Sequence, residues 1–242
     1  MRFNGVELRS VHRALSIEKE IPPGTAARKT ETISGADGEI VSDERIVQGE
    51  YLVRVNIVAG TREEGWAVRE LLAGWASLPG LGTAELIPTP RPQRCYDARL
   101  KSISDPEFVR GGAKIEVRFL LPRPVSRDVQ ESQASGAGRM TVRIGGTSAC
   151  RPVLSQKIAS RQEQLVWKMD GKPVLALTEP IEAGQTVTMD TKTGALLVDG
   201  VHAERLIDIA GTFWQPGYDP GTHVVQSSDG GVLEMRWHNE WL

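Results

Sequence analysis

Apolar and polar residues alternate along two long stretches of the chain, which is the pattern of half-buried β-strands. In residues 51–59 (YLVRVNIVA), every second residue, beginning with the tyrosine, is large and apolar. Residues 113–121 (AKIEVRFLL) place Ile115, Val117 and Phe119 on one face in the same way. Each stretch therefore predicts a strand with one face turned toward a core.

Shorter strand candidates fill much of the remaining sequence, separated by residues that favour turns. These candidates are YDARLKSI, MTVRIGG, QLVWKM, PVLAL, QTVTMD, ALLVDG, RLIDIAG, THVVQS and GVLEMRW. Asp-Gly pairs tolerate the positive φ angles of two-residue hairpin turns, and they stand at 37–38, 170–171, 199–200 and 229–230. Residues 190–194 (DTKTG) suit a longer hairpin loop. The pattern therefore predicts several β-hairpins.

Residues 61–78 (TREEGWAVRELLAGWASL) differ from the rest because their apolar residues have helical spacing. Those residues are Val68, Leu71, Leu72, Trp75 and Leu78. Thr61 and Glu64 form the pattern of a capping box at the helix start, and the Pro-Gly pair at 79–80 ends the segment. We predict one amphipathic helix packed across a sheet, with a ligand stacked between Trp66 and Trp75 as the alternative.

A change in composition divides the chain. Residues 124–138 (PVSRDVQESQASGAG) are rich in Pro, Ser, Gln and Gly, which is typical of a linker. We predict an α+β domain over residues 1–123, a linker over 124–138 and an all-β domain over 139–242. The close spacing of short strands in the last part indicates a β-sandwich or small barrel.

Composition and charge make several classes of protein less favoured, although local basic patches leave nucleic-acid binding open. The 242 residues are 40% hydrophobic and 25% charged, with a net charge of -2, so the chain lacks the basic balance typical of nucleic-acid binders. No apolar run is long enough for a signal peptide or a membrane span, so we expect synthesis in a cytoplasm. Cys95 and Cys150 are expected as thiols, with a disulfide between them as the alternative.

No motif for catalysis, cofactor binding or metal binding is present. The sequence has no nucleotide-binding loop and no GxSxG element, and its four histidines stand in separate segments. We therefore predict no catalytic, cofactor-binding or metal-binding residues and no enzymatic activity, with an enzyme of an unusual kind as the alternative. Four tryptophans of the second domain suit either its core or a sugar-binding platform: Trp167, Trp214, Trp237 and Trp241.

Residues 211–225 (GTFWQPGYDPGTHVV) place two aromatic residues before two Pro-Gly pairs, which suits either a substrate-gripping loop or a corner between strands. Together with FNGVEL (3–8), IPTPRPQRCYDARLKSI (87–103), IEVRFLLPRP (115–124) and VTMDTKTGALLVDG (187–200), this order of elements resembles the distal tail proteins of long-tailed siphophages and prophages. The resemblance favours the corner between strands.

The resemblance implies a structural role in the virion. Distal tail proteins form a homo-hexameric ring at the tail tip that joins the tail tube to tail-tip fibre, baseplate and receptor-binding proteins. It implies a mainly β fold with one helix: an N-terminal β-barrel-like ring-forming domain and a C-terminal galectin-like β-sandwich. Residues 21–41 are then either an arm that reaches a neighbouring subunit or a surface loop. A carbohydrate-binding β-sandwich module is the alternative function.

Overall fold

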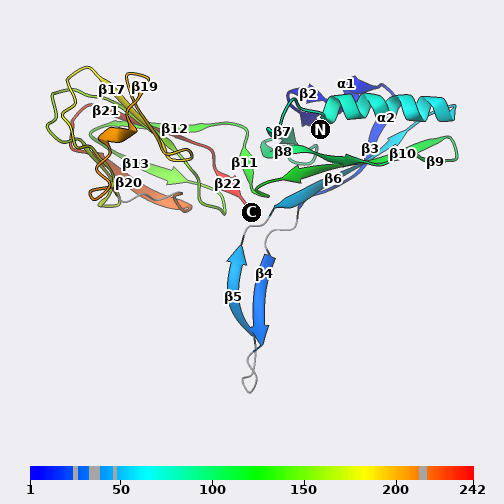
Figure 1. The fold of residues 1–242 in the computed structure, drawn as a ribbon, viewed down its shortest axis with the longest axis horizontal. Helices are drawn as coiled ribbons and strands as arrows, with labels where there is room; N and C mark the ends of the chain where they lie inside the picture. The colour runs from blue at the N-terminus through cyan, green and yellow to red at the C-terminus, as the bar shows by residue number, and fades with distance from the viewer. Residues whose placement is uncertain (24–26, 33–38, 46–47, 213–216) are drawn as a thin grey trace. The chain divides into compact units, whose positions relative to one another are not determined.

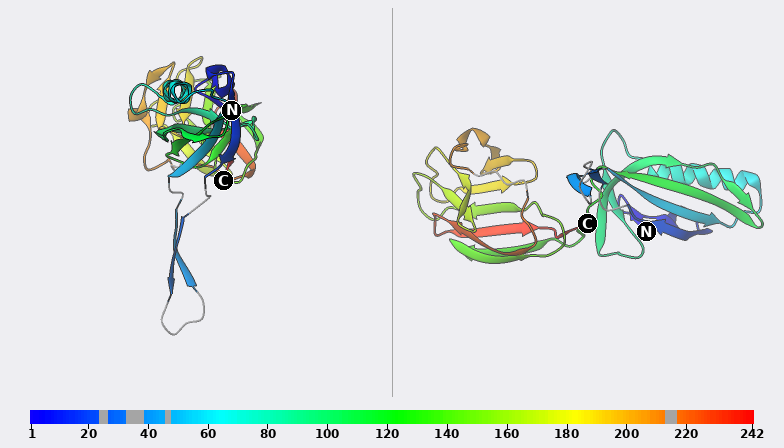
Figure 2. Two further views of the ribbon diagram at one scale, coloured as in Figure 1. Left: turned by 90° about the vertical axis from the view of Figure 1, so that its right-hand side faces the viewer. Right: turned by 90° about the horizontal axis from the view of Figure 1, so that it is seen from below.

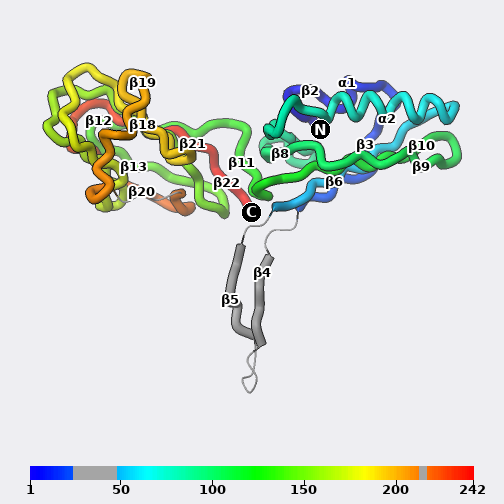
Figure 3. Tube along the Cα trace, in the orientation of Figure 1, coloured from blue at the N-terminus to red at the C-terminus, as the bar shows by residue number. Residues whose placement is uncertain are grey.

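A computed structural model describes residues 1–23, 27–32, 39–45, 48–212 and 217–242, with the backbone alone described for 27–32 and 39–45. The chain divides into two compact units, one of Met1–Arg127 with Leu242 and one of Asp128–Trp241. In Figure 3 the first unit takes the blue to green part of the tube and the second takes the green to red part.

The first unit is built on one antiparallel sheet (Figure 1). Its elements are β1 (Arg2–Phe3), β2 (Val6–Glu7), α1 (Leu8–Val11), β3 (Leu15–Ile21), β4 (Ala27–Thr32), β5 (Glu39–Arg45), β6 (Gly49–Ile57), α2 (Arg62–Ala76), β7 (Ala84–Ile87), β8 (Arg94–Ile103), β9 (Glu107–Val109), β10 (Gly112–Leu121) and β11 (Ser126–Asp128). The strand order is β2-β1-β7-β8-β10-β6-β3, and β9 pairs with β10.

The predicted alternation places the core of the first unit on one face of this sheet. Tyr51, Val53, Val55 and Ile57 of β6 are buried, as are Ile115, Val117 and Phe119 of β10. The two strands pair directly, with Val55 opposite Ile115 and Val53 opposite Val117. The apolar residues of β6 and β10 therefore lie side by side and form one continuous apolar surface.

Helix α2 covers that apolar surface, as Figure 2 shows. The predicted capping box is present: the Glu64 amide donates to Thr61 Oγ1 at 3.2 Å, and the Thr61 amide donates to Glu64 Oε2 at 3.3 Å. Val68 and Leu72 are buried. Leu71 was expected on the same buried face, but it is 49% exposed and does not belong to the core. The apolar stripe of α2 is broader than the part of the helix that contacts the sheet, so one edge of the stripe faces solvent.

The aromatic residues of α2 serve packing. The ring of Trp75 meets those of Phe3 and Phe119 nearly edge-on, with centroids 5.8 and 5.9 Å away. Its indole N–H donates to the carbonyl of Val6 at 3.1 Å. Trp66 is 43% exposed on the helix and lies beneath the guanidinium of Arg69. Trp75 is thus fixed as part of the core.

The second unit is a pair of antiparallel sheets around one core. Its elements are β12 (Ser132–Ala137), β13 (Arg139–Ile144), β14 (Val153–Lys157), β15 (Val166–Met169), β16 (Lys172–Ala176), β17 (Thr186–Asp190), β18 (Ala195–Val198), β19 (Val201–His202), the 3-10 helix η1 (Glu204–Leu206), β20 (Gly221–Ser227), β21 (Val232–Trp237) and β22 (Glu240–Trp241). One sheet has the order β12-β21-β14-β17-β18-β19 and the other β13-β20-β15-β16. The prediction of a mainly β chain with a C-terminal sandwich is confirmed.

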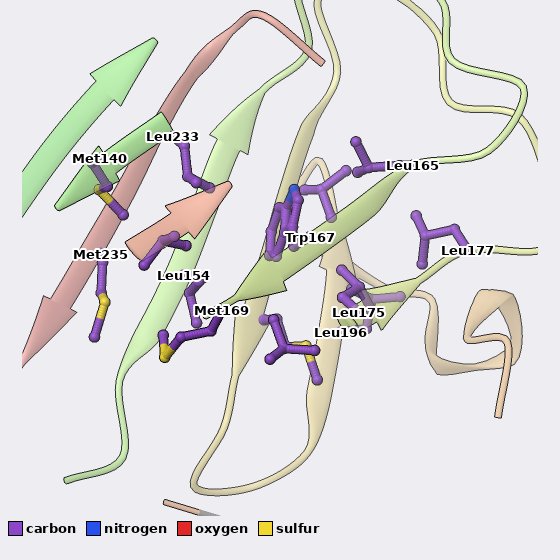
Figure 4. Close-up of a cluster of buried hydrophobic side chains, with 14 of the residues drawn as sticks. Met140, Leu154, Leu165, Trp167, Met169, Leu175, Leu177, Leu196, Leu233 and Met235 are labelled. Carbon is purple, nitrogen blue, oxygen red and sulfur yellow. The ribbon is translucent and has the colours of Figure 1, made fainter. Parts of the chain in front are cut away.

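The core of the sandwich is filled by side chains from both sheets (Figure 4). Trp167 and Met169 come from the four-stranded sheet, and Leu154, Leu233 and Met235 come from the six-stranded one. All five are at most 3% exposed. Alternation on each strand thus supplies one apolar layer to each side of the same interior.

The expected linker over residues 124–138 is wrong, because the segment contains β11 and β12. Strand β12 pairs with β21 over its full length, from Ser132 opposite Trp237 to Ala137 opposite Val232. Its small residues serve close packing: a Cβ on Gly136 would lie 2.4 Å from the carbonyl oxygen of Arg139. Small residues are needed here because neighbouring backbone approaches closely, so β12 has a linker-like composition although it is a paired strand. The independent folding of the two parts stays a prediction.

The Asp-Gly turns divide into two kinds. Asp170 and Asp199 have φ angles of 51° and 50°, and each lies in a two-residue hairpin turn, as predicted. The pair at 229–230 was expected to form a hairpin but instead joins β20 of one sheet to β21 of the other. The pair at 37–38 lies outside the described residues, and RLIDIAG (205–211), expected as a strand, begins within η1 instead.

Candidate assembly surfaces

The outer face of the first unit's sheet carries a ladder of paired charges. Arg54 of β6 stands opposite Glu116 of β10, and its Nε donates to Glu116 Oε1 at 3.1 Å. Arg118 Nη2 reaches the other oxygen of Glu116 at 3.1 Å, and Lys114 reaches Glu18 of β3 at 3.0 Å. Hydrogen bonds from Arg54 and Arg118 hold the pKa of Glu116 below its ordinary value.

The same ladder continues to β8. Glu50 accepts a hydrogen bond from Lys101, and this bond holds the pKa of Glu50 below its ordinary value. Arg118 lies 3.9 Å from the second oxygen of Glu50. These groups are largely open to solvent, which screens the pairs, so they contribute little to stability. The ladder therefore gives the face a fixed, nearly neutral pattern of charge.

Strand β3 forms one edge of this sheet and pairs with β6. Its register shifts between Ile17 and Lys19, which marks a β-bulge. At its far end Glu20 accepts hydrogen bonds from the Tyr51 hydroxyl at 2.7 Å and from the Thr89 amide at 3.2 Å. An edge strand leaves a row of backbone groups able to pair with another chain, and this one is held firmly in place at that end.

Strands β4 and β5 form a two-stranded sheet of their own, and no pairing with other strands is found in the described part of the chain. The register runs from Ala27 opposite Arg45 to Thr32 opposite Glu39. A lone two-stranded sheet is at best marginally stable in water. This hairpin covers much of the segment expected as an arm or a surface loop.

A hollow of about 270 Å³ lies between the end of β6 and helix α2. Val58 and Leu71 border it and are 75% and 49% exposed. Ala59 and Ala67 add small apolar walls, and Arg13 lies at its margin. His12 and Glu64 also line the hollow, so its walls are mixed in character.

Two of the four tryptophans considered for a sugar platform are buried. Trp167 is completely buried, and its indole N–H donates to Gln156 Oε1 at 2.7 Å. Trp237 is 6% exposed and donates to Asn239 Oδ1 at 3.1 Å. Trp241 donates to Asp128 Oδ1 at 2.9 Å, and Trp214 lies outside the described residues. The interpretation of Trp167 and Trp237 as core residues agrees with this burial.

Asp229, predicted as a residue of a hairpin turn, is a buried carboxylate. Its Oδ2 accepts from the amides of Ala159 at 2.9 Å and Gly231 at 2.8 Å, and its Oδ1 accepts from the amide of Ser160 at 3.2 Å. Gln156 joins this carboxylate to Trp167. Burial acts to raise the pKa of Asp229, but the N–H donors outweigh it and the net pKa is lowered.

His223 lies between two acceptors on neighbouring loops. Its Nδ1 is 2.7 Å from Asp170 Oδ2 and its Nε2 is 2.8 Å from the carbonyl oxygen of Asp219. Burial opposes its charge, but the bond to Asp170 and the carbonyl raise its pKa above the ordinary value. Two acceptors around one ring favour the doubly protonated imidazolium.

Comparison with known proteins gives a result at the level of the fold. No family model matches the sequence, and no curated protein matches it significantly. The crystal structure of SPP1 Dit (gp 19.1), described as a paradigm of the hub adsorption apparatus in phages infecting Gram-positive bacteria, matches with a TM-score of 0.83 at 12% identity. The match covers 99% of this chain and 98% of that one. The chain has the Dit fold. Structures of the phage P2 baseplate, activated with Ca or Sr, match with a TM-score of 0.46 at 9% identity, over 93% of this chain and 90% of those.

Most of the motifs on which the resemblance was based correspond to strands and turns of the structure. FNGVEL (3–8) forms the β1–β2 hairpin, whose Asn4-Gly5 turn has φ angles of 48° and 79°. IEVRFLLPRP (115–124) begins within β10, and VTMDTKTGALLVDG (187–200) forms β17, its loop and β18. In the last motif, β20 contains the expected strand, while residues 213–216 lie outside the described residues.

The remaining candidate residues of this Dit fold do not converge on one site. No group of three or more His, Cys, Asp or Glu side chains that could hold a metal occurs in the described residues. Cys95 and Cys150 are buried without a disulfide, and burial raises the pKa of Cys150 to about 12. No helix within the described residues combines the length and hydrophobicity needed to cross a membrane. The predicted lack of catalytic, metal and cofactor sites stays a prediction.

Proposed function

We propose that this protein is a distal tail protein: the hub at the tip of a siphophage or prophage tail. The observation that carries the proposal is the match to SPP1 Dit over nearly the whole of both chains. Both units of the present chain are included in that match, so the likeness extends beyond a common sandwich. The proposed role is structural, without catalysis or a cofactor, at the virion tail tip.

The hub would be a homo-hexameric ring formed by the first unit. Two features support this: the edge strand β3 and the two-stranded sheet β4–β5, which pairs with no other strand in the described part of the chain. A heterologous contact between such elements closes into a ring when its rotation divides a full turn. The tail tube protein, tail-tip fibre protein and receptor-binding or baseplate proteins are the proposed partners.

A carbohydrate-binding module is the competing function, in the form of an aromatic sugar platform. Such a platform needs exposed rings, whereas Trp167 and Trp237 fill the core of the sandwich. Aromatic stacking of sugar on these two residues therefore has no support from their positions.

Native mass spectrometry of the full-length protein at its highest soluble concentration, with negative-stain class averages, tests the proposal. We expect a hexamer and rings with six-fold symmetry. A deletion variant, in which a short Gly-Ser loop replaces residues 27–45, tests the assigned contact. Because β4 and β5 pair with each other, this variant should keep the circular dichroism spectrum of a folded protein while the hexamer is weakened.

The control variant is Asp199→Asn, in a hairpin turn of the second unit, and it should assemble like the unmodified protein. A chain that stays monomeric at every concentration, even with the adjoining tail proteins added, contradicts the hub. A hexamer that survives loss of residues 27–45 instead contradicts only the assigned contact.

A further inference from the structure

The outer face of the four-stranded sheet of the sandwich carries positive charge without compensating carboxylates. Strands β13, β20, β15 and β16 contain no Asp or Glu, whereas Arg139, Arg143 and Lys168 are exposed on this face. The alternation fixes their direction, because Met140, Val142 and Trp167, their neighbours in sequence, are buried in the core.

Strand pairing brings these cations close together. Arg139 of β13 and Lys168 of β15 both stand opposite Gln226 of the strand between them, β20. Two strand spacings separate them, about 10 Å. Arg143 stands opposite Thr222, four residues along β13 from Arg139, or about 13 Å. The three cations thus form a triangle across three adjacent strands.

These cations differ from those of the charge ladder on the first unit. There Arg54, Lys101, Lys114 and Arg118 each contact a carboxylate. Arg139, Arg143 and Lys168 have no carboxylate within 4 Å among the residues that the structure describes. Asp170, in the β15–β16 turn, is engaged with His223 of β20. The positive charge of this face is therefore open to a ligand.

Polar side chains stand beside the cations. Thr141, Thr222 and Gln226 point outward beside them, and a groove of about 430 Å³ runs along Gly138, Val166 and Lys168. Hydroxyl and amide groups of this kind donate hydrogen bonds to anionic or sugar oxygens. The face thus combines separated positive charges with neutral donors.

The lack of an apolar centre decides between two kinds of anionic partner. Protein interfaces normally have a core enriched in aromatic and other apolar residues. The apolar side chains on this face, Val166, Pro173 and Val224, are only half-buried. The exposed large apolar residues of the second unit lie outside these four strands: Val129, Val201, Ile209 and Val232. A chain of repeated anions needs no such centre, because charge neutralisation supplies the affinity.

We propose that this face, defined by Arg139, Arg143 and Lys168, binds an anionic glycopolymer: a linear chain of sugar or polyol units with repeating phosphate or carboxylate groups. The proposal does not depend on the hexameric ring, since all three cations lie on one sandwich. It assigns the second unit a binding function that requires no exposed tryptophan.

Biolayer interferometry with the full-length protein tests this, using immobilised poly(glycerol phosphate), polygalacturonate, neutral dextran and duplex DNA. We expect binding to one or both anionic glycopolymers and none to dextran. The polymer that is bound more tightly, poly(glycerol phosphate) or polygalacturonate, identifies the preferred anion as phosphate or carboxylate. With three cations engaged, raising monovalent salt from about 50 to about 200 mM should weaken binding about 20- to 40-fold.

The triple variant Arg139→Gln, Arg143→Gln and Lys168→Gln should weaken binding at least about tenfold, as expected when three phosphate contacts are lost. The matched control replaces Lys157, Lys192 and Arg205 with Gln, which removes the same charge from outside the face. It should change the affinity less than about twofold. Equal losses in the two variants, no binding to either glycopolymer, or tighter binding to DNA than to both would overturn the proposal.

Discussion

Replacing the buried carboxylate of Asp229 by an amide, Asp229→Asn, should strongly destabilise the sandwich. Both carboxylate oxygens face donors: Oδ2 faces the amides of Ala159 and Gly231, and Oδ1 faces the amide of Ser160. An asparagine therefore has no orientation in which its NH₂ group avoids a backbone N–H. Asp229 is 1% exposed, so water cannot replace the lost acceptor.

The size of the effect follows from the number of bonds. A hydrogen bond to a charged group contributes roughly 1.5–3 kcal/mol, and a buried donor left without a partner costs about 1–3 kcal/mol. At least one backbone donor loses its acceptor in either orientation, and the other bonds lose their charge. We expect a loss of about 3–5 kcal/mol, or a shift of roughly 2 M in the urea midpoint for a unit of this size.

The assay is urea unfolding, monitored by amide hydrogen exchange and mass spectrometry. Peptides from β14 and β21 report on the sandwich, and peptides from β6 and β10 report on the first unit. Asp199→Asn is the matched control, since Asp199 is also in an Asp-Gly pair but its bonds to Thr186 and Gln185 are exposed. That control should cost less than about 1 kcal/mol.

Acidity gives a second readout of the same carboxylate. Its pKa in the folded protein is lowered, so its contribution is present above the unfolded value of about 3.9 and is lost as pH falls through the folded pKa. The difference between the unmodified protein and Asp229→Asn should therefore shrink at acidic pH. Equal stability of the two proteins at neutral pH, or equal losses in Asp229→Asn and Asp199→Asn, would refute this reasoning.

Three further predictions concern other parts of the fold. Gly112→Ala should cost more than about 2 kcal/mol in urea unfolding, because the new Cβ would lie 2.1 Å from a carbonyl oxygen of β6, whereas Gly82→Ala, which meets nothing within 4 Å, should be nearly neutral. Thr61→Ala should cost about 0.5–2 kcal/mol by removing the helix cap, and a thermal midpoint unchanged from the unmodified protein would contradict this. The raised pKa of His223 makes its stabilisation present below the unfolded value of about 6.5 and lost as pH rises through the folded pKa, so NMR titration of the ring should give a pKa above that value, and Asp170→Asn should lower it.

Local patterns predicted the individual elements well where one face of an element is buried. The alternation from Tyr51 to Ile57 and the capping box at Thr61 both depend on residues close in sequence, and the structure contains them as expected. The outward residues of β6 and β10 were equally visible as polar positions. Which carboxylate meets which cation, as in the pair of Arg54 and Glu116, required the register of strands far apart in sequence.

The errors arose where packing overrode composition. Small and polar residues of β12 resembled a linker, but Gly136 is small because the carbonyl of Arg139 leaves no room for a side chain. Asp229 precedes a glycine and has the pattern of a hairpin turn, but the distant Ala159–Ser160 segment and Gly231 supply the backbone donors that surround its carboxylate. Neither environment can be read from neighbouring residues alone.

Hydrophobic periodicity along the sequence was enough to predict a mainly β protein with one amphipathic helix in its first part, because this periodicity is a local consequence of burial on one face. For Trp167 and Trp237, burial in the structure decided between a core and a sugar platform. The order of motifs in the sequence also led to the distal tail family, whose fold the chain shares with SPP1 Dit. That Arg139, Arg143 and Lys168 share one face without carboxylates becomes visible only in the folded protein. Those residues are separated along the chain, and a surface charge pattern exists only once strand order and register have brought them together.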